Sequence, residues 1–204
     1  LTEGNYIDTD RSFNYFANIF ASYQITDDLK FRLNVGPELR FQRSNDFRGT
    51  ESTTGRGGQN RASKFNQART SYTVENLLYY DKTFSNEHKL GATLLFSVQD
   101  IQNEENNISV RDIPSETQTF NNLGVAAPEN RNVSSKLDKE RWTSSMARVN
   151  YAYQDKYLIE LIGRYDGSSK LSAGNKWGFF PSGSLGWRIN REAFLINSKL
   201  VNNL

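Results

Sequence analysis

The side chains that most often carry out catalysis or hold metals are scarce in this chain. His88 is the single histidine among 204 residues, and cysteine is absent. No second histidine or carboxylate stands at metal-ligand spacing from His88, so we expect a solvent-facing turn residue there. The sequence also shows no pairing of a nucleophile with a general base, as covalent catalysis would require. The sequence therefore argues against an enzyme and predicts no cofactor and no metal site.

Two short motifs also lack the surroundings that would give them a function. Gly55, Gly57 and Gly58 are followed by no Lys-Ser/Thr pair and no predicted helix, so they do not resemble a phosphate cradle. The run Glu104-Glu105-Asn106-Asn107 lacks the glycine and the spacing of a calcium loop. The formal net charge of +2 comes from scattered basic residues balanced by acids, which indicates no nucleic-acid partner.

Three side chains are candidates for contact with a ligand: Arg164, Asp166 and Phe180. An Arg–Asp ladder that holds a strand end is the alternative role for Arg164 and Asp166, and we favour it. Phe180 belongs to an aromatic group that could stack on sugar rings, together with Trp177, Phe179 and Trp187. Phe179 and Trp187 are odd-numbered and Phe180 is even-numbered, so a strand would place them on opposite faces.

The elements that must position these residues are strands. From Leu29 to Phe41 every odd position is apolar or proline, while the even positions read Lys30, Arg32, Asn34, Gly36, Glu38 and Arg40. Such alternation is typical of a strand with one buried face. The same pattern, strong or weaker, predicts about seven strands: Phe13–Ile25, Leu29–Phe41, Tyr72–Asp81, Leu90–Val98, Thr143–Tyr153, Tyr157–Tyr165 and Trp177–Ile189.

The connections alternate between short and long. Three-residue turns, 26–28 and 154–156, would pair odd positions with odd positions and keep each apolar face on one side. Two long polar segments, 44–70 and 102–141, are predicted to be loops. No apolar run approaches the roughly 18–20 residues of a transmembrane helix. Short turns, long loops and aromatic residues near the short turns predict a segment of an antiparallel transmembrane β-barrel.

A soluble, carbohydrate-binding β-sandwich is an alternative, because its strands also alternate. Sandwich strands are shorter, however, and their long loops do not fall on every second connection. We therefore prefer the barrel, in which Phe179 and Trp187 would face lipid and Phe180 would face the lumen.

The last third of the chain resembles the barrel of SusC/RagA-type TonB-dependent transporters. The resemblance rests on SMARVNYAYQDK at 145–156, YLIELIGRYDGSSK at 157–170, NKWGFFPSGSLGWRI at 175–189 and REAF at 191–194. Lys170-Leu171 and Asn190-Arg191 depart from the family pattern outside its core. The matching residues, which we expect to be structural, are Tyr151, Tyr153, Asp155, Lys156, Tyr157, Gly167, Ser168, Trp177, Gly178, Phe179, Pro181, Ser182, Gly186, Trp187 and Arg188.

This resemblance implies a large outer-membrane barrel of about 22 strands around a plug. We expect residues 1–204 to be an interior part of that barrel, without the plug or the closing C-terminal strands, and segments 44–70 and 102–141 to be extracellular. It also implies active import of a glycan or oligopeptide, with a SusD-like surface lipoprotein as lid and TonB acting through parts outside this chain. Outer-membrane lipid would surround the barrel, and transporter–lid pairs would be able to dimerise. The alternative is an outer-membrane structural or adhesin barrel without transport.

Overall fold

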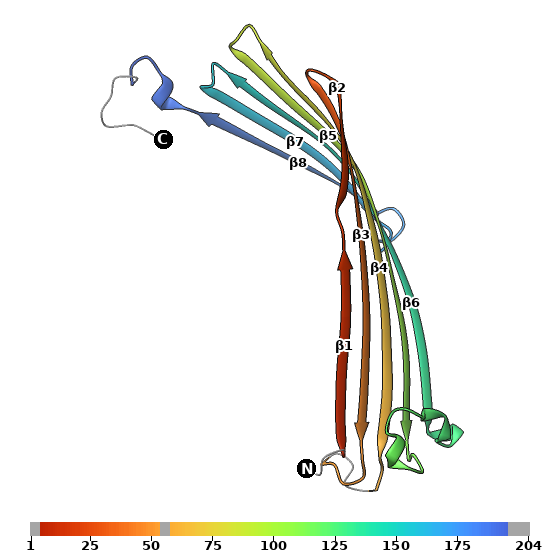
Figure 1. Cartoon of the computed structure of the whole chain (residues 1–204). Coiled ribbons are helices and arrows are strands. Elements are labelled where there is room, and N and C mark those ends of the chain that lie inside the picture. The colour runs from red at the N-terminus through yellow and green to blue at the C-terminus, as the bar shows by residue number, and fades with distance from the viewer. Residues whose placement is uncertain (1–4, 54–57, 196–204) are drawn as a thin grey trace. The chain divides into compact units, whose positions relative to one another are not determined.

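The computed structural model describes residues 5–53 and 58–195 and shows strands linked by turns and short 3-10 helices (Figure 1). The strands are β1 (Tyr6–Phe16), β2 (Ile19–Thr26), β3 (Leu29–Arg48), β4 (Arg61–Phe84), β5 (His88–Arg111), β6 (Arg131–Tyr153), β7 (Tyr157–Ser168) and β8 (Trp177–Trp187). They form one antiparallel sheet in the order β1-β3-β4-β5-β6-β7-β8, and β2 also pairs with β3. The prediction of an antiparallel barrel sheet is confirmed, and the two-sheet sandwich is wrong for the described residues. No helix in this part of the chain is long and apolar enough to span a membrane.

The strand predicted over Phe13–Ile25 is divided into β1 and β2, which is why eight strands stand where about seven were expected. The break lies opposite Gly36-Pro37 of β3, because Phe16 pairs with Glu38 and Ile19 pairs with Val35. Proline has no N–H to donate to a neighbouring strand, so the ladder loses a hydrogen bond there. The Ala17 N–H still donates to the Pro37 carbonyl oxygen at 3.0 Å.

The polar segments predicted as loops are largely strand, and their bounds need correction. β3 continues to Arg48 and β4 begins at Arg61, so the connection spans only 49–60; the other connection spans 112–130. Polarity misled the prediction, because regular alternation is expected only where one face of a strand meets an apolar environment. Beyond that stretch most residues of β3, β4 and β5 are polar, with single buried apolar residues such as Phe47, Ala62 and Val110, and hydrogen bonds between the strand backbones hold the sheet. The resulting strands β4 and β5 reach 24 residues each.

The short turns pair residues of equal parity, as predicted. At the β6–β7 turn Tyr153 pairs with Tyr157, and odd positions face odd positions to the end of the ladder. In the β2–β3 hairpin Tyr23 pairs with Phe31, although a bulge near the turn makes Thr26 the partner of Leu29. The β4–β5 turn has Ser85 and Asn86 at positive φ, the backbone that tight hairpins require.

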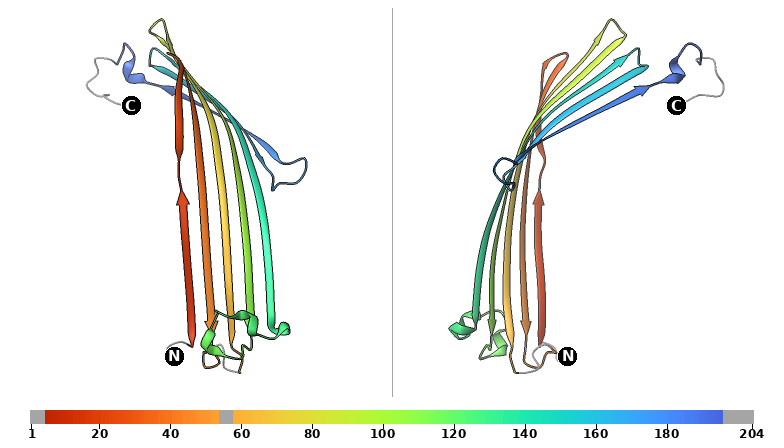
Figure 2. Two further views of the ribbon diagram at one scale, coloured as in Figure 1. Left: turned by 45° about the vertical axis from the view of Figure 1, so that its right-hand side comes forward. Right: turned by 180° about the vertical axis from the view of Figure 1, so that it is seen from behind.

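Contacts divide the chain into two units, which are described separately. The first comprises residues 1–17, 37–72 and 101–139, and the second comprises 18–36, 73–100 and 140–204. The first contains the small hydrophobic core of the described residues: Phe47, Ala62, Val110, Ile113, Leu123 and Ala126. Residues of the 112–130 connection thus cover one face of β3, β4 and β5 at their ends. Figure 2 shows the short helical turns of this connection folded against the strand ends.

The two long connections are bound to each other by hydrogen bonds. Glu116 accepts hydrogen bonds from the Thr50 N–H at 2.8 Å and the Asn60 side-chain amide at 3.1 Å. Asn60 also exchanges hydrogen bonds with the backbone of Ile113. Burial works to raise the pKa of Glu116, but these donors outweigh it and hold the pKa below its usual value of 4.5. The 49–60 and 112–130 connections therefore form one cap.

In the second unit the even positions of β3 face a polar side. Asn34 donates a hydrogen bond to Glu75 of β4 at 2.9 Å, and Lys30 lies 5.1 Å from the ring centroid of Tyr79. Arg148 of β6 and Glu160 of β7 form an ion pair on the same kind of face. The sheet thus has a polar face and, on the odd positions of β3, an apolar one. Tyr79, an aromatic residue of β4 near the β4–β5 turn, lies on the polar face with Lys30.

Candidate functional site

The structure brings together the three side chains predicted to contact a ligand. Arg164 of β7 is the direct cross-strand partner of Phe180 of β8. The Arg164 guanidinium Nε donates to the Asp166 carboxylate, with 2.8 Å to each oxygen. Ser144 of β6 donates to Asp166 at 2.5 Å and accepts from Arg164 at 3.2 Å. Four side chains from three adjacent strands therefore form one cluster.

The hydrogen bonds inside this cluster support the structural role for its charged members. Arg164 and Asp166 satisfy each other, and the buried Ser144 closes the network between β6 and β7. Phe180 has no polar group to join this network; its side chain is 58% exposed, and the edge of its ring lies against Gly178. The Arg164 side chain is also half exposed, so Phe180 and Arg164 both have surface open to a ligand, whereas Asp166 is more buried. Contact with a ligand stays a prediction for all three.

The end of β7 is closed by aromatic packing over a glycine. Tyr165 and Trp177 stack with ring centroids 5.0 Å apart and planes 8° apart. A Cβ on Gly167 would lie 2.6 Å from the Trp177 ring, so only glycine fits beneath it. The next residue, Ser168, is buried, and its N–H donates to the Lys176 carbonyl oxygen at 2.9 Å. These residues fix where β7 ends and the 169–176 connection starts.

The β6–β7 turn is held by charged side chains from neighbouring segments. The Asp155 carboxylate lies 2.7 Å from the Lys89 ammonium and 3.4 Å from the Arg191 guanidinium. The hydrogen bond from Lys89 lowers the pKa of Asp155 below its usual 3.8, so the carboxylate stays ionised. Asp155 and Gln154 adopt positive φ, which makes this a tight, strained turn. These contacts agree with the structural role predicted for Asp155.

Glu192, which lies in the REAF segment, organises the chain after β8, and sequence reasoning gave it no role. Its carboxylate accepts hydrogen bonds from the Tyr157 hydroxyl at 2.7 Å and the Trp187 indole N–H at 3.1 Å. Lys156 reaches the same carboxylate at 3.3 Å. The Tyr157 bond is the largest of the causes that hold the pKa of Glu192 below its usual 4.5. The segment after β8 is thereby tied to the β6–β7 turn.

His88 is packed rather than free in solvent, which corrects the prediction for this residue. Its Nδ1 lies 2.6 Å from the Tyr151 hydroxyl, and its ring lies against Tyr153 with centroids 4.9 Å apart. The contact arises because β5 and β6 are neighbours in the sheet, and residue spacing within one strand does not predict it. Aromatic stacking continues from Tyr153 to Tyr157 and from Tyr157 to Trp187. Among the described residues no three acidic, histidine or cysteine side chains gather as metal ligands would.

A cationic surface lies at the other ends of β3, β4 and β5, within the first unit. Arg48, Arg61 and Arg111 line a cavity of about 500 Å³ together with Arg131, Asp46 and Glu129. Arg48 forms an ion pair with Asp46 at 3.1 Å, whereas Arg61 and Arg111 form none within residues 5–53 and 58–195. Their sequence neighbours Phe47, Ala62 and Val110 belong to the buried core on the opposite face. We call these four arginines the arginine surface.

The arginine surface was not singled out from the sequence. All four residues lie in the segments 44–70 and 102–141, which the sequence predicted to be extracellular loops. Alternation with apolar neighbours, as in Phe47-Arg48, Arg61-Ala62 and Val110-Arg111, is the signal that would have placed them on one strand face.

Comparison with known proteins gives a consistent set of relatives. A scan against models of protein families matched none. The TonB-dependent receptor P3 of Formosa agariphila is 32% identical over 195 residues, which cover 96% of this chain and 19% of that receptor. The TonB-dependent receptor SusC of Bacteroides thetaiotaomicron is 43% identical over 61 residues, or 30% of this chain and 6% of SusC. This chain is a segment of a SusC-like TonB-dependent receptor.

The fold of this receptor segment agrees with a solved relative. A structure described as the RagAB peptide transporter superposes with a TM-score of 0.85 at 17% identity, covering 95% of this chain and 22% of that chain. At that identity the likeness concerns the fold. The segment spans about a fifth of the length of the receptor P3, and its curated relatives bear the names of receptors rather than enzymes.

The remaining family-motif residues of the receptor segment lie in or just after β8. Phe179 pairs with Tyr165 and Trp187 with Tyr157, so both aromatic residues share the odd face, as their parity predicted. Pro181 stands opposite Gly163, and Gly186 lies under the side chain of Leu158. Ser182 pairs with Ile162 at an even position, and Arg188 donates to the Asp155 carbonyl oxygen at 3.3 Å. These contacts agree with a structural role, which stays a prediction.

Proposed function

We propose that this chain forms part of the wall of an outer-membrane importer that takes up a glycan or an oligopeptide. TonB supplies the energy through parts of the receptor outside this chain, and a SusD-like surface lipoprotein acts as lid. Transporter–lid pairs are able to dimerise in this arrangement. Support comes from the curated relatives, which are TonB-dependent receptors, and from the structurally similar RagAB peptide transporter.

The face pattern of β3 is the observation that carries the membrane placement. Its odd positions are apolar or proline from Leu29 to Phe41, and the strand continues through polar residues to Arg48. Crossing the bilayer takes about 9–11 residues of a tilted strand. The apolar stretch meets that requirement, and the remaining residues of the strand extend beyond the lipid. A large barrel whose strands extend beyond the bilayer requires long strands with one face that is apolar over part of its length.

Sidedness follows from the lengths of the connections. Outer-membrane barrels have short periplasmic turns and longer extracellular loops. Asp27-Asp28, 85–87 and 154–156 are the short turns, while 49–60 and 112–130 are the long connections. We place the long connections, and with them the arginine surface, outside the cell.

Single cysteines test this placement, because the chain has none of its own. Ser115→Cys lies in a long connection and Asp27→Cys in a short turn, and both positions are exposed. In a full-length receptor without other reactive cysteines, a membrane-impermeant maleimide is expected to label Ser115→Cys on intact cells. Asp27→Cys is expected to react only after the outer membrane is opened.

The two cysteine variants control for each other, since each must react fully after lysis. Labelling of Asp27→Cys but not Ser115→Cys on intact cells would reverse the topology. Labelling of neither variant in any membrane fraction, with all receptor in the soluble fraction, would overturn the membrane placement.

The arginine surface supports an acidic substrate. Its cavity holds four arginines against two carboxylates, and Arg61 and Arg111 form no ion pair within the described residues. Clustered charge of one sign raises the local concentration of ligands with the opposite charge. An acidic glycan or an acidic oligopeptide therefore fits the arginine surface better than a neutral one.

Uptake by intact cells tests import directly. We expect cells that carry the full-length receptor to accumulate a fluorescent acidic oligopeptide or a fluorescent uronate-containing glycan. Accumulation should disappear when the receptor gene is deleted or when a protonophore removes the proton gradient that energises TonB. If surface binding persists without accumulation, the alternative of an adhesin or structural barrel holds instead.

A further inference from the structure

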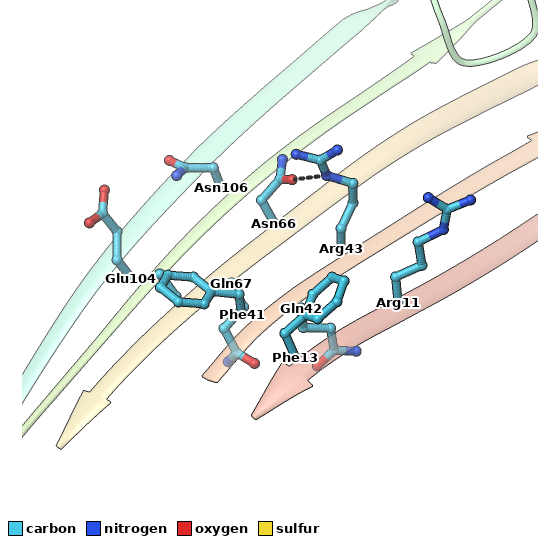
Figure 3. A pocket seen from close by; sticks show the side chains of 10 residues that line it. Arg11, Phe13, Phe41, Gln42, Arg43, Asn66, Gln67, Glu104 and Asn106 are labelled. Atoms are coloured by element: carbon cyan, nitrogen blue, oxygen red, sulfur yellow. Dashed lines mark hydrogen bonds between the residues drawn. The ribbon is translucent and has the colours of Figure 1, made fainter. Parts of the chain in front are cut away.

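A groove of about 460 Å³ lies on the first unit, on the face opposite the arginine surface (Figure 3). Arg11 and Phe13 of β1, Phe41 and Arg43 of β3, Asn66 of β4 and Glu104 of β5 line it. Figure 3 shows the two arginines and the two phenylalanines on the neighbouring strands β1 and β3. We call this groove the Phe–Arg groove.

The β1–β3 register places these four side chains on one face. Phe13 pairs with Phe41, and Arg11 pairs with Arg43. Residues directly opposite each other in an antiparallel pair share a face. Arg43 extends the groove toward β4 by donating from Nε to the Asn66 amide oxygen at 3.3 Å. The aromatic pair and the cationic pair are thus adjacent along the strands.

The two arginines are like charges placed directly opposite each other without an acidic partner. Neither forms an ion pair within residues 5–53 and 58–195, in contrast to Arg48 on the opposite face of β3. Like charges in such a cross-strand pair destabilise a sheet. Lys64 adds a third cation where a cavity of about 420 Å³ continues past Arg11 and Arg43. An anion held between these groups would remove the repulsion.

The aromatic half of the groove is open to solvent, with Phe13 58% exposed and Phe41 44% exposed. In β3 the unbroken run of apolar or proline odd positions ends at Phe41, and Arg43 is the next odd residue; Phe47, further along the same face, is covered by residues of the 112–130 connection. Aromatic residues followed by cations are typical of the level where acyl chains meet charged head groups. The groove therefore suits a ligand with an apolar part at the phenylalanines and an anionic part at the arginines.

We propose that the Phe–Arg groove binds a phosphorylated lipid of the outer leaflet, such as lipopolysaccharide. A phosphate lies between Arg11 and Arg43, with Lys64 within reach of a further anionic group. The acyl chains lie along Phe13 and Phe41. This proposal rests on the membrane placement given above, and it concerns a site on the lipid-facing side of the wall rather than the substrate path.

Binding of defined probes to the purified, delipidated full-length receptor in detergent tests the proposal. The probes are lipopolysaccharide, the same lipid after enzymatic removal of its phosphates, and inorganic phosphate alone. The variants are Arg11→Gln/Arg43→Gln and, as a matched control, Lys30→Gln/Arg40→Gln, which removes the same charge from the even face of β3. Each cation near an anionic lipid contributes roughly fivefold in affinity. We therefore expect about thirtyfold weaker lipopolysaccharide binding for the first variant and no change for the control.

The wild-type receptor gives a second readout that needs no variant: dephosphorylated lipid is expected to bind at least tenfold more weakly than the intact lipid. Equal binding of lipopolysaccharide by all three proteins would overturn the proposal, and so would equal binding of the two lipids. Tight binding of inorganic phosphate alone would make the groove a simple anion site and overturn the lipid assignment. A receptor absent from the outer-membrane fraction would instead contradict the membrane placement.

Discussion

Replacing Gly167 with alanine is expected to lower the free energy of unfolding by about 1–3 kcal/mol, the usual cost of forcing atoms into a packed site. The new Cβ would lie 2.6 Å from the Trp177 ring. Trp177 would have to move, and its stacking on Tyr165 would be lost. Such aromatic pairs contribute about 0.5–1.5 kcal/mol beyond the area they bury. Urea unfolding of the full-length receptor in lipid, followed by circular dichroism, measures the change.

Gly124→Ala is the matched control, because the nearest atom to its added Cβ is 3.9 Å away. We expect that variant to stay within about 0.5 kcal/mol of the wild type. A second test combines Gly167→Ala with Trp177→Ala. Once the indole is absent, the alanine should cost little, because the clash has been removed. The same cost with and without Trp177 would show that the steric explanation is wrong.

Reversing the charge of Arg61 or Arg111 is expected to reduce uptake of an acidic probe by about tenfold to thirtyfold. Each reversal removes one attraction and adds one repulsion, and each amounts to about 1 kcal/mol for charges 4 Å apart in water. Both side chains line the same cavity without an ion-pair partner in the described part of the chain. Uptake of the fluorescent acidic oligopeptide by cells expressing Arg61→Glu or Arg111→Glu measures the effect.

Lys139→Glu serves as the control, because it reverses an exposed charge of β6 that does not line the arginine surface. We expect normal uptake by that variant, and normal uptake of a neutral probe by all variants. The defect should also diminish as salt is added, since ionic strength screens exposed charges. An equal loss of acidic and neutral probes would indicate damage to the barrel and contradict charge recognition at this surface.

The sequence determined the strands wherever one face meets an apolar environment. In β3 the alternation from Leu29 to Phe41 is unbroken, and the structure has a strand there with the expected faces. The turn at Tyr153–Tyr157 was equally predictable, because its length sets the parity of the whole β6–β7 ladder. The same parity predicts that Arg164 and Phe180 share the even face, and the structure pairs them directly.

Other features depended on a neighbouring strand and had no local signal. The break between Phe16 and Ile19 arises opposite Pro37, and the chain itself is apolar at alternate positions through the break. The strand ends near Arg48 and Arg61 are mostly polar, with single buried apolar residues at Phe47 and Ala62, so their composition resembles that of a loop. Backbone hydrogen bonds to adjacent strands hold them, and such bonds do not depend on side-chain type.

By itself, the sequence determined the class of fold, the faces of the strands and the family, because period-two alternation and a dense motif are written in consecutive residues. Tertiary structure alone decided which residues from distant strands meet. Contacts of this kind are the His88–Tyr151 hydrogen bond, the Arg11–Arg43 cross-strand pair, and the hydrogen bonds of Glu192 with Tyr157 and Trp187. The physical reason is that register between strands is a property of the whole sheet. A shift of one residue would preserve every local pattern and still separate all of these pairs.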